Sequence, residues 1–148
     1  MKNLIFILIL TLSSFSLAEG ESPLNYNENL WGHWQYIGHF YEGQFQEPLN
    51  PNLILTFEFS EDGTDRLQWH RLNEDGFCDR QGKYSFDGKV LTDQVIWVNP
   101  ENGFECGKDP DMQVGHVTQT NVKIINDQIH MELPLGDKSL IYVWNRIK

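Results

Sequence analysis

Short stretches of alternating apolar and polar residues fill most of the chain after residue 30. In one of them, Leu53, Leu55, Phe57 and Phe59 share one face of an extended segment, and Ile54, Thr56, Glu58 and Ser60 share the other. A period of two is typical of antiparallel strands that bury one face. Residues 53–60 are therefore predicted to form a strand whose leucine and phenylalanine side chains point into a core.

Turn residues separate this strand from others of the same kind. Asp-Gly pairs at 62–63 and 87–88 tolerate the positive φ that tight hairpins require, and 73–76 and 126–127 also have the composition of turns. A polar loop is predicted at 99–111. The predicted strands are one that begins at Gly32, followed by 53–60, 67–71, 82–86, 90–98, 114–120, 122–125, 129–133 and 140–146.

Eight or nine strands joined by short turns predict an all-β domain. Strands that follow one another in this way favour an up-and-down meander, which either closes into a barrel or packs as a sandwich. Closure removes exposed edges, and an eight-stranded barrel has an interior wide enough for side chains or one small ligand. We therefore predict a single antiparallel up-and-down β-barrel of about eight strands, formed by residues 30–148.

The first 18 residues have the composition of a signal peptide. Lys2 precedes an apolar run from Leu4 to Leu12, and Ser16-Leu17-Ala18 ends in the small residues that signal peptidase recognises. The run is well short of the roughly 20 residues that a membrane-spanning helix needs. We expect cleavage after Ala18, a periplasmic or secreted protein with no stable membrane insertion, and a flexible N-terminal arm at 19–29.

The chain is strongly acidic and contains two cysteines. Its formal net charge is −10, and removal of Lys2 with the signal peptide changes this to −11. Nucleic acid is not an expected partner, because its binding depends on Lys and Arg clusters that neutralise phosphates. Cys78 and Cys106 are an even pair in a small exported protein, so one disulfide between them is predicted.

No residue pattern predicts a metal site, a cofactor or a catalytic centre. The histidines lack the spacing of metal ligands, and the acidic loop 101–111 lacks the spacing of an EF-hand. The carboxylates Asp62, Asp65, Glu74 and Asp75 fall at hairpin turns and are interpreted as turn formers. The five histidines are His33, His39, His70, His116 and His130.

Four residues are candidates for ligand binding because of their positions on two predicted strands. Trp69, Arg71, Tyr142 and Trp144 alternate with leucines and can therefore face the barrel interior. A mostly apolar cavity with one cation and a phenol suits a small amphipathic or anionic ligand. Packing of these aromatic side chains in a plain core is the alternative.

Residues of the first and of the last predicted strand together match a known motif. Gly32-His33-Trp34 matches the Gly-x-Trp that opens the first strand of lipocalins, and Arg146 matches an arginine that packs over that Trp. In these residues the chain resembles the calycin group, and most of all the small bacterial lipocalin-like proteins. The resemblance implies that Gly32, Trp34 and Arg146 are structural, with the guanidinium stacked on the indole, and that residues 42–52 cap the open end of the barrel.

Together these features favour an exported, non-enzymatic protein that holds a small hydrophobic or amphipathic ligand in its barrel. An alternative is a protein-binding module, because the bacterial metalloprotease inhibitors are also small, exported, disulfide-bonded barrels with a similar start. In that case the segment 19–29 enters the cleft of an exported partner protein. A small-barrel enzyme is the third class, and it needs a convergent acid–base set that no motif here supplies.

Overall fold

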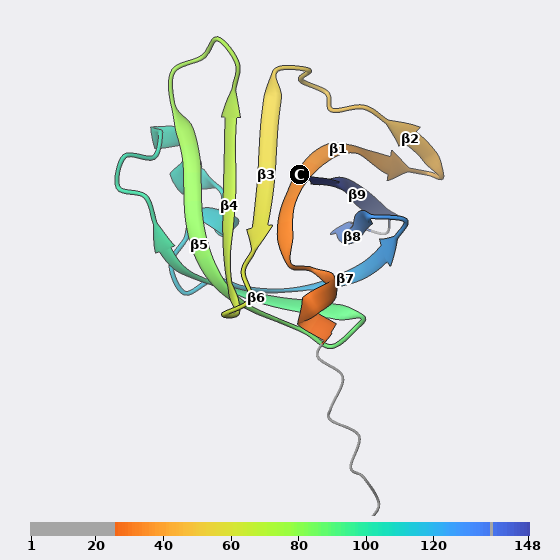
Figure 1. Ribbon diagram of the computed structural model, residues 1–148. Helices are drawn as coiled ribbons and strands as arrows, with labels where there is room; N and C mark the ends of the chain where they lie inside the picture. Colours follow the sequence, from red (N-terminus) through yellow and green to blue (C-terminus); the bar gives the residue numbers. More distant parts are fainter. Residues whose placement is uncertain (1–25, 137) are drawn as a thin grey trace, which may run out of the picture.

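The computed structural model describes residues 26–136 and 138–148, which form nine strands and three short 3-10 helices (Figure 1). The strands are β1 (Gly32–Tyr41), β2 (Gln44–Gln46), β3 (Leu53–Phe59), β4 (Thr64–Arg71), β5 (Phe77–Phe86), β6 (Val90–Val98), β7 (Val117–Ile125), β8 (Gln128–Leu135) and β9 (Lys138–Ile147), and the 3-10 helices are η1 (Tyr26–Asn29), η2 (Phe104–Lys108) and η3 (Pro110–Met112). The predicted signal peptide at 1–18 and residues 19–25 of the predicted arm lie outside the described residues. Within the part of the chain that is described, no helix is long and apolar enough to cross a membrane.

The strands pair in one antiparallel sheet that closes on itself. From β3 to β9 each strand is hydrogen-bonded to the next, and β1 pairs with both β3 and β9. The closing ladder runs from His33 opposite Ile147 to Tyr41 opposite Leu140. The predicted all-β, up-and-down antiparallel barrel is therefore confirmed, with β1 and β3 to β9 forming the barrel and β2 added at its edge.

The short strand β2 pairs with the C-terminal part of β1, where that strand bends. Glu42 and Gly43 both have positive φ, as tight hairpin turns require, and this turn folds β2 back along β1. Gly38 has a φ of 146°, and a β-carbon there would lie 2.7 Å from the ring of Phe45. A glycine at position 38 thus allows β1 to pair with β3 in its first half and with β2 in its second.

Several predicted strand boundaries are wrong. Residues 117–125 form one strand rather than two, because Asn121 does not turn the chain but continues the pairing with β6 on one side and β8 on the other. Residues 114–116 precede this strand in a turn where Gly115 has a φ of 89°. In addition, β5 starts at Phe77, ahead of the predicted segment 82–86.

The inward side chains at one end of the barrel form a tightly packed aromatic core. Trp34, Phe59 and Ile129 are each no more than 1% exposed. The ring centroids of Phe57 and Phe59 are 4.3 Å apart, and those of Phe59 and Tyr84 are 4.9 Å apart. Full burial of one such side chain stabilises the fold by roughly 1.5–3 kcal/mol, so this cluster is a main source of stability.

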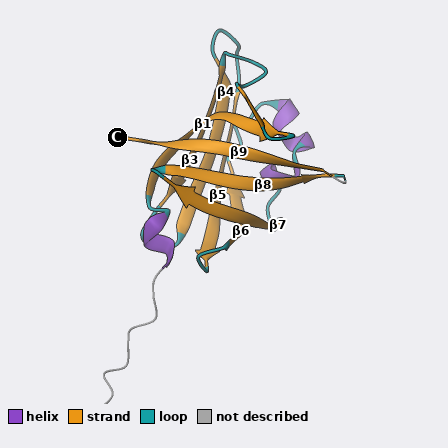
Figure 2. Cartoon of the chain, turned by 90° about the vertical axis from the view of Figure 1, so that its right-hand side faces the viewer, coloured by secondary structure: helices purple, strands orange, loops and turns teal. Residues whose placement is uncertain are grey.

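The 3-10 helix η1 closes this end of the barrel. Asn27 accepts a hydrogen bond at Oδ1 from the backbone N–H of Phe86 over 2.8 Å. The ring of Tyr26 lies against Gly88, where an added β-carbon would come within 2.9 Å of it. Residues 26–29, which belong to the predicted arm, are thus packed on the barrel. Figure 2 shows η1 on the opposite side of the molecule from η2 and η3.

Arg146 lies at this same closed end. Its guanidinium carbon is 4.1 Å from the ring centroid of Trp34, and its N–H groups donate to the backbone oxygens of Trp31 and Asn29. A β-carbon at Gly32 would lie 2.9 Å from Nη1 of Arg146, so glycine leaves room for the guanidinium. The three residues that the lipocalin resemblance marks as structural meet at this point.

A candidate ligand-binding cavity inside the barrel

A cavity of about 590 Å³ lies inside the barrel, on the side of the core away from η1. Trp69, Arg71, Tyr142 and Trp144 all line it, so the structure brings the four predicted binding residues together. Much of the remaining wall is apolar. It includes Leu53, Leu55, Leu91, Met131 and Leu133.

The pleat of the strands explains why these four side chains meet. Trp69 and Arg71 are two positions apart on β4, and Tyr142 and Trp144 are two apart on β9, so each pair points to one side of the sheet. Burial raises the pKa of Tyr142, with a smaller contribution from the charge of Asp109. The phenol therefore stays protonated near neutral pH and can donate a hydrogen bond into the cavity.

Three charged side chains form a buried cluster beside the cavity. The guanidinium of Arg80 donates through Nη1 to Asp65 and through Nη2 to Asp93, and all three residues are at most 5% exposed. Arg80 and Asp93 form part of the cavity wall, next to Phe57, whose ring centroid is 5.3 Å from the guanidinium carbon. Buried charges are costly unless they are paired. Here both carboxylates pair with the guanidinium, while Asp65 Oδ2 and Arg80 Nε have no hydrogen-bond partner among the described residues.

The protonation state of this cluster follows from its burial. Desolvation and the neighbouring Asp93 carboxylate raise the pKa of Asp65 to about 8, while the Arg80 guanidinium acts in the opposite direction. Two carboxylates that share one guanidinium in a low-dielectric site cannot both ionise easily. Near neutral pH one proton therefore stays on the pair, and the cluster has no net charge.

The interpretation of Asp65 as a turn former is wrong. Asp62 does form the turn, where it accepts hydrogen bonds from the backbone and hydroxyl of Thr64. Asp65, in contrast, is the second residue of β4 and points inward with 2% exposure. Asp65 and Trp69 are four positions apart on β4 and therefore share one face, which is the signal in the sequence for an inward Asp65. The inward positions of Arg80 and Asp93 were not predicted either.

The expected loop at 42–52 does not border the cavity, and its role as a cap is not supported by the lining residues. The connection between β6 and β7 contributes instead, through Asp109 and Asp111 in and next to η3. Asp109 Oδ1 also accepts from the backbone N–H of Asp111 over 2.9 Å and so caps this helix. The cavity wall thus carries a second cation, Arg80, and acidic side chains beside the expected cation Arg71 and phenol Tyr142.

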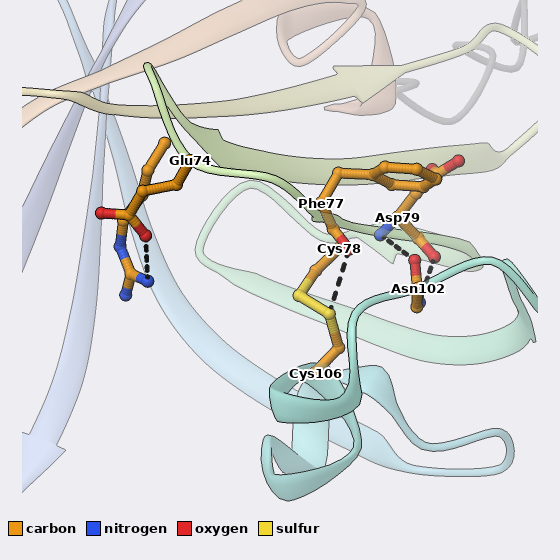
Figure 3. Close-up of a disulfide and its surroundings, with 7 residues drawn as sticks. Glu74, Phe77, Cys78, Asp79, Asn102 and Cys106 are labelled. Atoms are coloured by element: carbon orange, nitrogen blue, oxygen red, sulfur yellow. Dashed lines mark hydrogen bonds and ion pairs between the residues drawn. A yellow bond between two sulfur atoms is a disulfide. The ribbon is translucent and has the colours of Figure 1, made fainter.

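A disulfide fixes this connection to the barrel wall (Figure 3). Cys78 on β5 is bonded to Cys106 in η2, with their Cα atoms 5.6 Å apart, which confirms the predicted pairing. The backbone N–H of Asp79 donates to Asn102 Oδ1 over 2.8 Å, and Asn102 Nδ2 donates back to the Asp79 carbonyl over 3.0 Å. The covalent bond and the paired hydrogen bonds together hold the segment that carries Asp109 and Asp111.

The five histidines do not form a metal site with other side chains of the described residues. Among residues 26–136 and 138–148, no group of three or more His, Cys, Asp or Glu side chains is placed to hold a metal ion. His39 instead pairs through Nδ1 with the Tyr36 hydroxyl over 2.9 Å, and His33 and His116 lie near Glu58 and Asp111 at the surface.

No known protein family matches this chain, and no curated protein is similar to it in sequence. The closed, eight-stranded antiparallel barrel is consistent with a lipocalin-like fold. Membership of the calycin group remains a prediction from Gly32, Trp34 and Arg146. What the molecule does has to be argued from the cavity.

Proposed function

We propose that this protein is a non-enzymatic binding protein that holds a small hydrophobic or amphipathic molecule inside its barrel. The observation that carries the proposal is the cavity of about 590 Å³ with a largely apolar wall. Sites for small molecules typically have volumes of roughly 300–1,000 Å³, apolar and aromatic walls, and a few polar groups that fix orientation. The aromatic side chains Trp69, Tyr142 and Trp144 supply such a wall.

An exported location is part of this proposal. The Cys78–Cys106 disulfide is of a kind that persists in oxidising compartments such as the periplasm or the exterior of the cell. The sequence of residues 1–18, which has the composition of a signal peptide, points in the same direction. Export places the cavity where small apolar molecules need a carrier through water.

The proposal is tested with a neutral fluorescent probe, N-phenyl-1-naphthylamine, and two Leu→Trp variants. Leu133 lines the cavity, so Leu133→Trp fills part of it and is expected to weaken probe binding about tenfold or more. Leu72 is 47% exposed in the β4–β5 turn and does not line the cavity. The matched variant Leu72→Trp is therefore expected to bind the probe like the unmodified protein.

Native mass spectrometry of the protein purified from its own source provides a second test. A small molecule that is lost on denaturation would support the proposal and identify the ligand. Equal loss of probe binding in both Leu→Trp variants, or no binding by the disulfide-bonded protein, would contradict it.

A further inference from the structure

We propose that the molecule held in the cavity is an amphiphile whose polar end carries a positive charge, a proposal that rests on the binding function above. Five charged side chains line the cavity: Arg71, Arg80, Asp93, Asp109 and Asp111. Their preference for a ligand depends on which charges are already neutralised by the protein itself. The guanidiniums are neutralised and two of the carboxylates are not.

The charge of Arg80 is balanced by carboxylates of the protein, although its Nε has no hydrogen-bond partner among the described residues. Its Nη1 and Nη2 groups pair with Asp65 and Asp93, and its side chain is only 3% exposed. An anionic ligand would have to displace a carboxylate from this buried cluster, and breaking a buried ion pair is strongly unfavourable. The inner wall of the cavity therefore offers no free positive charge.

Arg71 is the second cation of the wall, and it also has partners. Its Nη1 is 3.4 Å from Oε2 of Glu74, and its guanidinium carbon is 5.5 Å from the ring centroid of Trp69. Its side chain is 44% exposed, so water and salt screen its charge. Glu74 thus balances the charge of Arg71 before a ligand binds.

Asp109 and Asp111 are the charges without a strong cationic partner. Within the described part of the chain, neither carboxylate pairs with a Lys or Arg, and the contact from Asp111 Oδ1 to His116 Nε2 is 3.8 Å long. Partial burial and repulsion from the nearby Asp109 raise the pKa of Asp111, whose side chain is 49% exposed, while Arg80 and His116 act in the opposite direction. A cation beside both of them relieves this repulsion.

The cavity wall also contains buried N–H groups that have no hydrogen-bond partner among the described residues. Trp144 is 3% exposed, and its indole N–H has no hydrogen-bond partner among the described residues. Buried N–H groups of native proteins are nearly always paired. Arg80 Nε, on the same wall, is also unpaired among the described residues, so a bound molecule that carries a hydrogen-bond acceptor can pair with these donors.

These features define an orientation for the ligand. The apolar tail lies against Leu53, Leu55 and Leu133, and the charged end lies beside Asp109 and Asp111 on the β6–β7 connection. The aromatic faces of Trp69 and Tyr142 can add to the attraction, because a ring face favours a cation. The formal net charge of −10 also favours the approach of cations over anions.

The test compares three probes with the same tail and different ends: decyltrimethylammonium, 1-decanol and decanoate. Binding to the full, disulfide-bonded protein is followed by tryptophan fluorescence near neutral pH, below the concentration at which the probes form micelles. We expect the cation to bind about tenfold tighter than the alcohol and the alcohol to bind tighter than the anion, with the difference shrinking as salt is added.

Two Asp→Asn variants assign the preference to the cavity. Asp111→Asn removes a lining charge and is expected to reduce the preference for the cation over the alcohol about three- to tenfold. Asp75→Asn removes the same charge from the exposed β4–β5 turn, outside the cavity. It is expected to leave the preference unchanged.

Each other outcome overturns the inference. Equal binding of the three probes, tightest binding of decanoate, or equal effects of the two variants would exclude selection of a cation by Asp109 and Asp111 and leave the binding function intact. Binding of none of the probes would overturn the binding function as well, and the inference with it.

Discussion

At position 82, a glycine faces the inside of the barrel and leaves space for three charged side chains. An added β-carbon there would lie 2.7 Å from both Arg80 Nη1 and Asp65 Oδ2, and close to Asp93. These side chains cannot move aside freely, because Arg80 is bonded to both carboxylates and all three residues are buried. Gly82 is thus selected by the space that its neighbours need and not by an unusual backbone conformation.

This reasoning predicts that Gly82→Ala is destabilising. Overpacking of a well-filled interior costs about 1–3 kcal/mol, and we expect a loss of this size in the free energy of unfolding measured by urea denaturation. The control is Gly107→Ala, because a β-carbon at Gly107 meets no atom within 4 Å. Similar stability of the two variants would contradict the steric argument.

The proton held by Asp65 predicts a pH-dependent stability. The folded-state pKa of Asp65 is raised to about 8, above the unfolded value of about 3.9, so its contribution to stability falls as pH rises through this interval and then levels off. The Asp65→Asn variant stays neutral and mimics the protonated residue. Its stability relative to the unmodified protein is expected to increase by more than about 1 kcal/mol between about pH 5 and about pH 9.

Denaturation curves of both proteins at the two pH values measure this difference. A difference that does not change with pH would show that Asp65 is not the group that holds the proton.

At the scale of the element, the connection between β6 and β7 forms part of the cavity wall. It carries Asp109 and Asp111, and it is held to β5 by the Cys78–Cys106 disulfide and by the hydrogen bonds of Asn102. Opening the disulfide frees a loop with a sequence separation of 28 residues. The strands of the barrel are paired through their backbones, so we expect their pairing to survive the loss of this bond.

We therefore predict separate effects of the disulfide on stability and on fold. Replacement of both Cys78 and Cys106 by Ser is expected to lower the free energy of unfolding by roughly 3–4 kcal/mol, the value for a loop of this length in the chain-entropy model. Far-ultraviolet circular dichroism is expected to stay that of a barrel. The reduced, unmodified protein serves as a control and is expected to unfold at the same urea concentration as the variant.

The elements differ in how well the sequence predicts them. The inward faces of β3, β4 and β9 follow from a local period of two, and so Trp69, Arg71, Tyr142 and Trp144 could be placed in one interior. The buried Asp65 was not placed there, although it shares a strand face with Trp69, because a carboxylate on a strand normally marks the solvent side. The path of the β6–β7 connection could not be predicted from the sequence either, because it depends on contacts with β5 residues that are distant along the chain.

The whole molecule has one closed end and one hollow half. Arg146 closes the first through its stacking on Trp34 and its bonds to two backbone oxygens, and the cavity lies beyond the aromatic core. This separation predicts that changes at the closed end alter stability more than binding.

Arg146→Lys tests that separation while it keeps the charge. A lysine cannot stack a planar group on Trp34 or donate in a fixed fork, so we expect a loss of about 1–3 kcal/mol in the free energy of unfolding. Affinity for N-phenyl-1-naphthylamine is expected to change less than about twofold, within the usual range for substitutions at distant, independent positions. A large change in affinity with unchanged stability would contradict this division of the molecule.

The β1–β9 seam has a consequence for how the chain reaches its native state. Most ladders join strands that are neighbours in sequence, whereas the seam joins His33 to Ile147, more than 100 positions later. Hairpins with short loops form quickly, and contacts between distant segments form slowly because loop closure must come first. Until β1 meets β9, both strands are open edges that can pair with another copy of the chain. The rate of this last closure therefore sets how long the folding chain is exposed to aggregation.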